Sequence, residues 1–332
     1  MAIVFAKNSG INDGLWKPVG QVLTSVMQDA DAEQSDYDGF VKAVFNASPS
    51  SKYAEKISSM TEFGNFDEKV EGGAFASQEI QEGNSKLIVH SAFGDKFSCS
   101  EEMREDGDID IMKIASMNFV RAAKRSRATF ASNALTAQGT SFTYNGKTYD
   151  RTTGDGKALF AVDHTGVKSG VATQSNVFTN AFGTDATMLY RLANVGRNFR
   201  NQSGIVEGYT FDTIVIPSDQ PALEDLIDRI IHSAQIVGSG NNDVNTQQNK
   251  WKKVVDPLWQ SGASAPYILL SSKANQNKQG NKLYDRKPLV MKNWVDNDTD
   301  NLCWSGYMRF GVGFYDWRHV IMGGATTGTT LA

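Results

Sequence analysis

TEFGNFDEKVEGGAFASQEIQEGNSKLIVHSAFGDKF, residues 61–97, alternates apolar and charged side chains and is punctuated by glycine. With EGG at 71–73 and EGN at 82–84, this alternation predicts a long β-hairpin. Both arms mix apolar and charged residues, so little remains to form a core within the hairpin. Because a two-stranded ribbon alone is marginal in water, we expect this one to lie across another surface.

The pattern changes to that of a helix at Cys99 or Ser100 and holds for about thirty residues, a rod of roughly 45 Å. Acidic residues gather at its start and the basic run KRSR, at 124–127, lies toward its end, an order that suits the helix dipole. Gly107 can separate a short first turn, and Gly139 is the expected stop. The apolar stripe recurs at three- and four-residue steps and comprises Met112, Ala115, Phe119, Ala122, Ala123, Phe130, Ala131 and Ala134.

A second amphipathic helix is expected near the start of the chain, where DADAEQSD at 29–36 interrupts the pattern. A short helix cannot bury its own apolar stripe, so this one must dock either on its own body or on a neighbour. Its stripe comprises Leu15, Trp16, Val19, Val22, Leu23 and Val26.

The remainder predicts an irregularly alternating α+β chain without internal repeats. Asn145–Gly146 marks a two-residue hairpin turn. Helices are expected after the caps at 184–185 and 218–219, and a polar excursion is expected at 273–288. The expected strands are 209–217, WKKVVDPLW at 251–259, APYILLSS at 265–272, and three segments within 289–324.

Composition sets broad limits on function. The chain has 332 residues, 40% hydrophobic and 21% charged, which excludes disorder as its main state. The 33 basic and 37 acidic residues leave a net charge of −4, which argues against a dedicated DNA-binding protein. Two isolated cysteines suit a reducing compartment. There is no signal peptide pattern and no apolar run of about 18 residues that could cross a bilayer.

Candidate catalytic and phosphate-binding motifs are incomplete. Gly146-Lys147-Thr148 resembles the end of a phosphate-binding loop, but Ser141 stands where the first glycine belongs. No serine lies in a GxSxG elbow, and neither Cys99 nor Cys303 has an activating neighbour in sequence. The KRSR run could touch phosphate, although its place in the helix explains it equally well. We expect no enzyme.

Candidate metal and cofactor motifs are incomplete as well. Gly238-Ser239-Gly240 begins a dinucleotide-like pattern, yet it follows a helix and belongs to a polar loop. The acidic triplet Asp296, Asp298 and Asp300 opens like a calcium loop but lacks the glycine and the final glutamate. Asp163-His164 could serve as a base or ligand, yet a structural role is favoured because no histidine pair has metal-ligand spacing. We expect no cofactor and no metal.

The order of the parts resembles the major capsid protein of tailed bacteriophages, with its Hong Kong 97-type fold. Local sequences support the resemblance: GKALFAVDHTG at 156–166 is similar to the family's "LF…DH" segment, residues 228–259 to its helix, Asn-rich loop and "DP-L" strand, and FGVGFYDWRHVIMGG at 310–324 to its closing strand. FGDKFSCSEEM at 93–103 also fits the entry into the family's spine helix. The similarity covers nearly the whole chain.

The resemblance implies a domain division. It comprises an N-terminal arm at 1–50, an E-loop β-hairpin at 51–98, a P-domain with the spine helix at 99–184, an A-domain at 185–271, and return strands at 272–332. The E-loop would lie over an adjacent subunit, the P-domain at local symmetry axes, and the A-domain at the capsomer centre.

The implied function is a structural one, in which pentamers and hexamers build an icosahedral virion shell around double-stranded DNA in the bacterial cytoplasm. Expected partners are other copies, a separate scaffolding protein, a portal and a possible decoration protein. The separate scaffold is expected because the arm begins almost at Met1. Covalent cross-links from Lys69 or Lys86 are not expected. Two alternatives remain open, namely a shell protein of an encapsulin-type nanocompartment and a phage tail or baseplate protein.

Site residues follow from the same resemblance. The expected intersubunit contacts are Trp16, Val19, Phe63, Phe66, Phe75 and Ile80. The expected capsomer-axis loop residues are Asn241, Asn242, Asp243 and Asn245.

Overall fold

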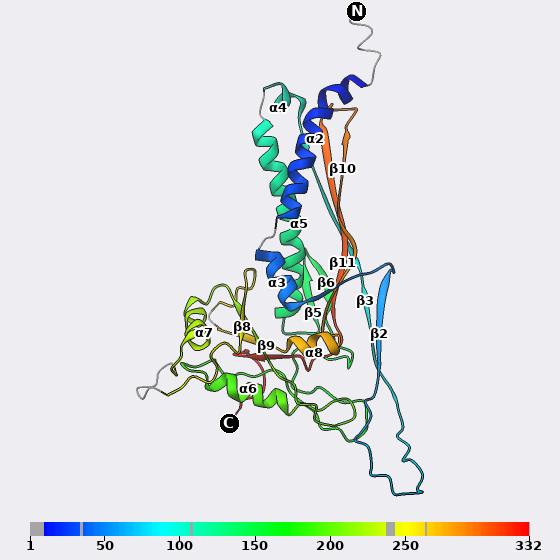
Figure 1. The fold of residues 1–332 in the computed structure, drawn as a ribbon. Coiled ribbons are helices and arrows are strands. Elements are labelled where there is room, and N and C mark those ends of the chain that lie inside the picture. Colours follow the sequence, from blue (N-terminus) through cyan, green and yellow to red (C-terminus); the bar gives the residue numbers. More distant parts are fainter. Residues whose placement is uncertain (1–9, 34–35, 107–108, 237–242, 263, 332) are drawn as a thin grey trace, which may run out of the picture.

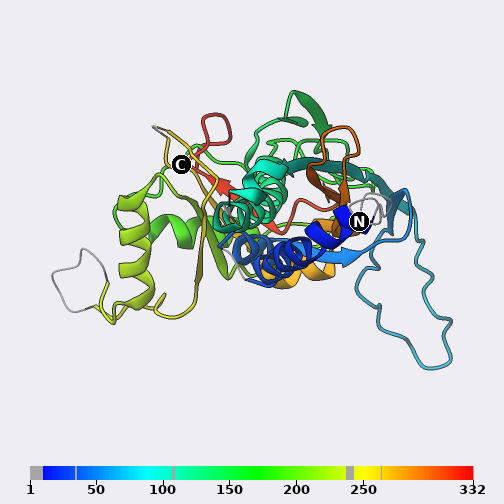
Figure 2. The same ribbon diagram turned by 90° about the horizontal axis from the view of Figure 1, so that it is seen from above.

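The computed structural model describes residues 10–33, 36–106, 109–236, 243–262 and 264–331. Helices and long strands rise from a wider base, and a two-stranded ribbon runs down one side and ends in a loop below that base (Figure 1). Seen from above, the same loop projects beyond the rest of the molecule (Figure 2). Among the described residues, no helix is both long and apolar enough to cross a bilayer.

The predicted long helix is present as α5, Ile109–Thr136, after the short helix α4, Glu101–Glu105. At 1.5 Å per residue, the 28 residues of α5 span about 42 Å. The expected break at Gly107 lies outside the described residues. The upper half of α5 packs on the N-terminal helix, and its lower half enters the main core through Phe130, Ala131 and Ala134. Phe119 and Ala122, also in the predicted stripe, are only partly buried.

The N-terminal helix α2, Gly10–Ala32, is longer than predicted, and α3, Asp36–Val44, follows it. The interruption predicted at 29–36 is confirmed, since α2 ends within it, but the helix continues to Ala32 because its end is stabilised from outside. The Lys124 ammonium donates hydrogen bonds to the carbonyls of Ala30, Asp31 and Glu33, at 3.1, 2.7 and 2.6 Å. A cation there satisfies carbonyls that have no partner within the helix.

We call the first four-stranded sheet the upright sheet, with strand order β1-β10-β11-β4. Its strands are β1, Asn46–Pro49; β10, Asn281–Val295; β11, Leu302–Phe314; and β4, Ser91–Cys99. The prediction of a polar excursion, a loop without regular structure, at 273–288 was wrong. Helix α8, Ser272–Asn277, and the start of β10 occupy this segment. The buried amides of Asn275 and Asn281 both donate to the carbonyl of Val44, which gives these polar residues partners in the interior.

We call the pair β2, Ala54–Met60, and β3, Glu82–Val89, the ribbon. The predicted hairpin is present only in part. Its first strand lies before residue 61, and residues 61–81, expected to supply the first arm, form no strand. Its second arm ends earlier than expected, because the segment after His90 joins the upright sheet as β4. Phe97 stacks on Trp304 of β11 at 5.1 Å, which draws this segment away from the ribbon. The ribbon lies closely on β11, where a Cβ at Gly313 would come within 2.5 Å of the Ile88 side chain.

The base contains a second four-stranded sheet, the base sheet, with strand order β12-β9-β7-β8. Its strands are β12, Val320–Gly323; β9, Tyr267–Leu270; β7, Thr213–Pro217; and β8, Lys252–Asp256, with helices α6, Thr187–Arg197, and α7, Pro221–His232. All five residues of β7 are buried. The predicted turn at Asn145–Gly146 is confirmed between β5, Ser141–Tyr144, and β6, Lys147–Asp150, with both turn residues at positive φ.

Arg151 closes the lower end of α5 from inside the protein. Its fully buried guanidinium donates to the carbonyls of Ala134, Leu135 and Gly139, at 2.7, 3.0 and 2.9 Å. Since carbonyls at a helix end lack partners within the helix, this side chain joins α5 to the segment that follows it.

Replacing Arg151 with Lys should lower the free energy of unfolding by about 2–4 kcal/mol, because one ammonium cannot keep all three buried hydrogen bonds. Denaturant titration of the unassembled chain measures this change. The matched control is Arg229→Lys, whose exposed pair with Asp225 should contribute less than about 1 kcal/mol. Equal effects of the two substitutions would contradict this role of Arg151.

Candidate assembly surfaces

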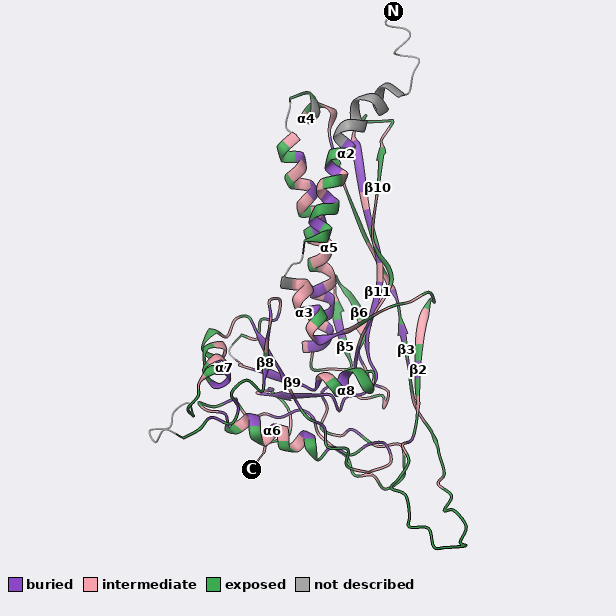
Figure 3. Cartoon of the chain, viewed as in Figure 1, coloured by how far each residue is buried: buried purple, intermediate pink, exposed green. Residues whose placement is uncertain are grey.

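We call residues 61–81 the tip loop. It connects β2 to β3 without forming strands, and almost all of it is exposed (Figure 3). Phe66 is 93% and Phe75 83% exposed, fractions that are unusual for such large apolar side chains. The other exposed apolar side chains in or beside the loop are Met60, Phe63, Val70 and Ile80.

The tip loop keeps its course through a few polar contacts. The Gln78 side chain accepts from the amide of Gly64 at 2.6 Å and donates to the carbonyl of Asn65 at 3.0 Å. The Lys69 ammonium lies 4.3 Å from the centre of the Phe75 ring. These contacts cross the loop but bury little apolar surface, so its aromatic side chains remain available to another molecule.

The root of the tip loop is fixed firmly to the base. Lys278 bridges the carboxylates of Glu62 and Glu207 at 2.8 and 3.0 Å, and the Ser203 hydroxyl donates to the carbonyl of Glu62 at 2.6 Å. The Tyr315 hydroxyl bonds to the Ser59 hydroxyl and donates to a carbonyl of β3. The loop thus projects from a held root.

The charges at this root shift one another's pKa. Burial alone would lower the pKa of Lys278, but its bonds to Glu62 and Glu207 outweigh burial and raise it. Burial alone would raise the pKa of Glu207, but hydrogen bonds from Tyr209 and Lys278 hold that pKa below its usual value. The ion pair is therefore fully charged near neutral pH.

The two lysines considered for cross-links have different surroundings. Lys86 is buried and bonds to Asp150 and to the Thr152 hydroxyl. Lys69 is exposed on the tip loop. The expectation that neither forms a cross-link stays a prediction.

The arm residues expected at subunit contacts lie in α2, but the side chains of Trp16 and Val19 are outside the described part of the structure. The described half of α2 buries Leu23 and Met27 in the apolar cluster that contains Met112 and Trp304. The described half of α2 therefore packs on its own chain and not on a neighbouring copy.

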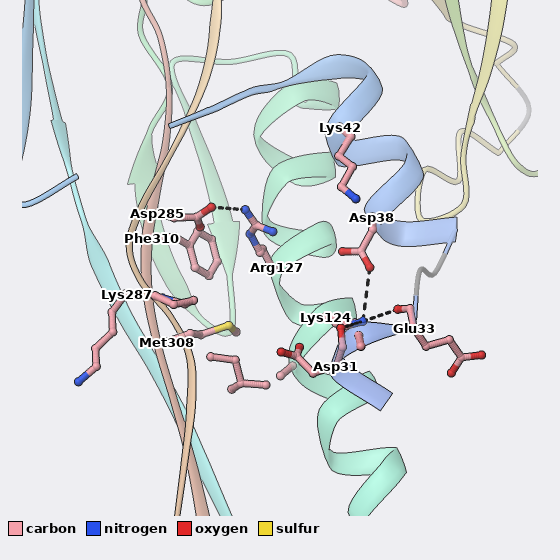
Figure 4. A pocket seen from close by; sticks show the side chains of 14 residues that line it. Asp31, Glu33, Asp38, Lys42, Lys124, Arg127, Asp285, Lys287, Met308 and Phe310 are labelled. Atoms are coloured by element: carbon pink, nitrogen blue, oxygen red, sulfur yellow. Dashed lines mark hydrogen bonds and ion pairs between the residues drawn. The ribbon is translucent and has the colours of Figure 1, made fainter. Parts of the chain in front are cut away.

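A pocket of about 340 Å³ lies where α2, α3, α5 and the upright sheet meet (Figure 4). Its main charged side chains are paired within the chain. Lys124 faces Asp38 at 3.6 Å besides holding the end of α2, and Arg127 binds Asp285 at 2.5 Å. Two basic residues of the KRSR run thus serve internal contacts, which removes the main sequence argument for a phosphate site there.

The expected capsomer-axis loop is described only in part. Asn241 and Asn242 lie outside the described residues, and Asp243 is exposed. Asn245 is buried, and its amide donates to the carbonyls of Ile230 and Ser233 at 2.6 and 2.9 Å. Asn245 thus ties the C-terminal part of the loop to the end of α7, and the proposed axial role of these residues stays a prediction.

Asp163 and His164, although adjacent in sequence, lie in different environments. His164 is fully buried, bonds to the Asp155 carboxylate at 2.7 Å and stacks on Trp317 at 4.2 Å, while Asp163 pairs with Lys157. Burial alone would raise the pKa of Asp155, but the contact with His164 outweighs it and the pKa is lowered. A histidine enclosed in this way has no access to a substrate.

The other candidate sites are the acidic triplet at 296–300 and the two cysteines. The acidic triplet at 296–300 lies in the turn between β10 and β11, and the described residues contain no group of three side chains suited to a metal ion. Cys99 and Cys303 are free and buried, and burial raises the pKa of both thiols. Neither thiol is therefore activated.

Comparisons with known proteins agree with this arrangement. Residues 84–323 match a family described as phage capsid protein. A structure from Mycobacterium phage Patience has a TM-score of 0.54 and 13% identity, covering 95% of this chain and 89% of its own. One from Mycobacterium phage Adephagia has a TM-score of 0.54 and 10% identity, covering 89% and 92%.

A third structure, the capsid of an empty GTA particle, has a TM-score of 0.52 and 11% identity, covering 90% of this chain and 91% of its own. At such low identities these structures show a shared fold. No curated protein sequence matches the chain significantly.

Replacing Lys278 with Met should loosen the root of the tip loop, because Glu62 and Glu207 lose their shared cation. Amide exchange at 59–62 and 80–84 should become about tenfold faster, corresponding to about 1.4 kcal/mol of local opening. Hydrogen-exchange mass spectrometry measures this, with exposed Lys273→Met as the control. Unchanged exchange at the root would refute the bridging role.

The same contacts should weaken in acid. A carboxyl whose pKa is lowered by folding stabilises the folded state above its unfolded value, near 4.3, and loses that contribution as pH falls through the lowered value. Protection of the root, corrected for intrinsic exchange, should be steady from about pH 5 to 7 and fall below about pH 4. Glu207→Gln should remove much of this step, and an equal acid step in that variant would assign it to another group.

Proposed function

Because the chain belongs to the phage capsid protein family and is a structural major capsid protein with the Hong Kong 97-type fold, we propose that its tip loop is a principal contact between copies in the icosahedral shell. The protein is located in the virion.

The exposure of the tip loop is the observation that carries the proposal. Burying a large apolar side chain contributes about 1.5–3 kcal/mol, so Phe66 and Phe75 together offer several kcal/mol that this chain leaves unused. In a closed assembly of identical copies, each chain both gives a loop and receives one. Many repeated contacts of moderate strength then hold the shell together.

The remaining assignments extend this proposal. Pentamers and hexamers form the shell, with the loop at 238–249 near their axes and the upright sheet with α5 between them. The division into arm, E-loop, P-domain and A-domain follows the ranges given above. The net charge of −4 suits a container of DNA, because a strongly basic wall would bind the genome tightly. The shell encloses double-stranded DNA without reading its sequence.

Partners and place of assembly are also proposed. A separate scaffolding protein and a portal act during assembly in the bacterial cytoplasm, and a decoration protein could cover the finished shell. The chain has no catalytic activity in this proposal, and the burial of His164 supports that view.

Mass measurement and imaging test the proposed function. Light scattering and negative-stain microscopy of the purified chain, with and without its scaffolding protein, should reveal rings of five or six copies or closed shells. Tubes would favour a tail protein, and shells that hold a protein cargo would favour a nanocompartment. A chain that stays a 36.3 kDa monomer under all conditions would overturn the proposal.

Replacing both Phe66 and Phe75 with Ser should prevent or greatly weaken assembly and leave the fold intact. Both side chains contact little in their own chain, so the free energy of unfolding should change by less than about 0.5 kcal/mol each. The control replaces both with Leu, which keeps apolar surface and should still assemble. Normal assembly of the Ser variant would show that the tip loop is not a principal contact.

A further inference from the structure

Helix α5 changes from large to small side chains where it crosses the upright sheet. The large residues Phe119 and Phe130 stand eleven positions apart, which is about 16 Å of helix. Between them, the helix residues on the side of β4 are small, namely Ala122, Ala123 and Ser126. Small side chains over this length leave space between the helix and the sheet if the helix is held at a constant height.

The two phenylalanines hold α5 at that height. The ring of Phe119 lies so close to Gly306 of β11 that a Cβ at that position would come within 2.8 Å of it. The ring of Phe130 packs on those of Phe93 and Phe310, with ring centres 5.4 Å apart in both pairs. Because each end of the stretch rests on the sheet through an aromatic ring, the helix between them cannot approach the strands more closely.

A pocket of about 300 Å³, which we call the α5 pocket, lies in this space between α5 and the β4 side of the sheet. Its volume is at the lower end of the range of small-molecule sites in proteins. Tyr144, at the end of β5, closes one end, with its ring 5.9 Å from that of Phe93. Because its aromatic residues are only half-buried, the pocket is open to solvent. The side chains that characterise it are Phe93, Asp95, Phe119, Ala122, Tyr144 and Met308.

Asp95 gives the α5 pocket a negative charge. Of the described residues that line the pocket, it alone is charged. Its carboxylate accepts a hydrogen bond of 2.8 Å from the amide of Lys96 and forms no ion pair with any described residue. The Asp95 side chain is exposed, so the carboxylate lies at the mouth of the pocket. A carboxylate there attracts cations and repels anions.

Aromatic walls and a carboxylate without a cationic partner select the same kind of ligand. The faces of aromatic rings attract cations, and the apolar interior favours a ring over a polar group. We infer that the α5 pocket binds a small organic cation, an arylalkylamine whose ring packs against Phe119 and Ala122 and whose ammonium group faces Asp95. The pocket is formed within one chain, so this inference goes beyond the proposed shell function and does not depend on it.

Titration with 2-phenylethylamine, which is protonated at neutral pH, tests the inference. In the purified chain labelled with ¹³C at its methionine methyl groups, the NMR signal of Met308 reports on the pocket, and that of Met322, buried in the base sheet, serves as the reference. The Met308 signal should shift with a Kd below about 1 mM, and the Met322 signal should stay in place. The uncharged 2-phenylethanol should bind about fivefold more weakly, and the anion phenylacetate more weakly still.

Two substitutions separate the charge of the pocket from its space. Asp95→Asn keeps the shape and should weaken binding of the amine about fivefold, without changing the affinity for 2-phenylethanol. Ala122→Leu should fill the pocket and abolish binding of both compounds. The matched control is Asp67→Asn, which removes an exposed carboxylate from the tip loop and should leave both affinities unchanged. Circular dichroism checks that each variant folds.

Three results would overturn the inference. They are the absence of a Met308 shift at about 10 mM amine, equal affinities for the amine and the alcohol, and an unchanged affinity of the Asp95→Asn variant for the amine. None of them bears on shell formation, which light scattering and imaging test separately.

Discussion

The rest of this structure depends on one constraint, which is that a two-stranded ribbon can bury little apolar surface. Strands β2 and β3 have seven and eight residues, and the apolar side chains that they bury against the body are Ile57 and Ile88, which pack on Tyr315. Beyond Met60 the chain leaves that support and carries its large apolar side chains into water. Exposed apolar patches of this kind mark interaction sites. A capsid protein that assembles from identical copies provides the missing cover in the form of another copy.

A projecting loop is useful only when the body that carries it is rigid, and two cations contribute to that rigidity. Arg151 binds the carbonyls at the end of α5, and Lys124 binds those at the end of α2. Both helix ends are thereby fixed to neighbouring elements instead of to water, as their dipoles favour. Lys278 serves the same purpose at the ribbon's root, where it joins Glu62 to Glu207. A firm spine and a firm root together set the direction of the loop.

Local patterns were enough to predict α5 and the Asn145–Gly146 turn, because periodicity and turn chemistry act over a few residues. The first arm of the ribbon was mispredicted, since it lies at Ala54–Met60 and residues 61–81 form no strand. The end of the ribbon was mispredicted because Phe97 pairs with Trp304, about two hundred residues away in sequence. The apolar tip loop could be foreseen from its lack of a core. The role of Lys278 could not, since Glu62 and Glu207 are distant in sequence and only the fold brings them together.

The central claim is that the tip loop of one copy is covered by another copy. A cryo-electron microscopy reconstruction of the assembled particle tests it most directly, because side chains at subunit contacts become visible. The account predicts that Phe66 and Phe75 are buried against a neighbouring subunit. A shell in which both rings remain exposed to solvent, or in which the loop folds back on its own chain, would contradict it.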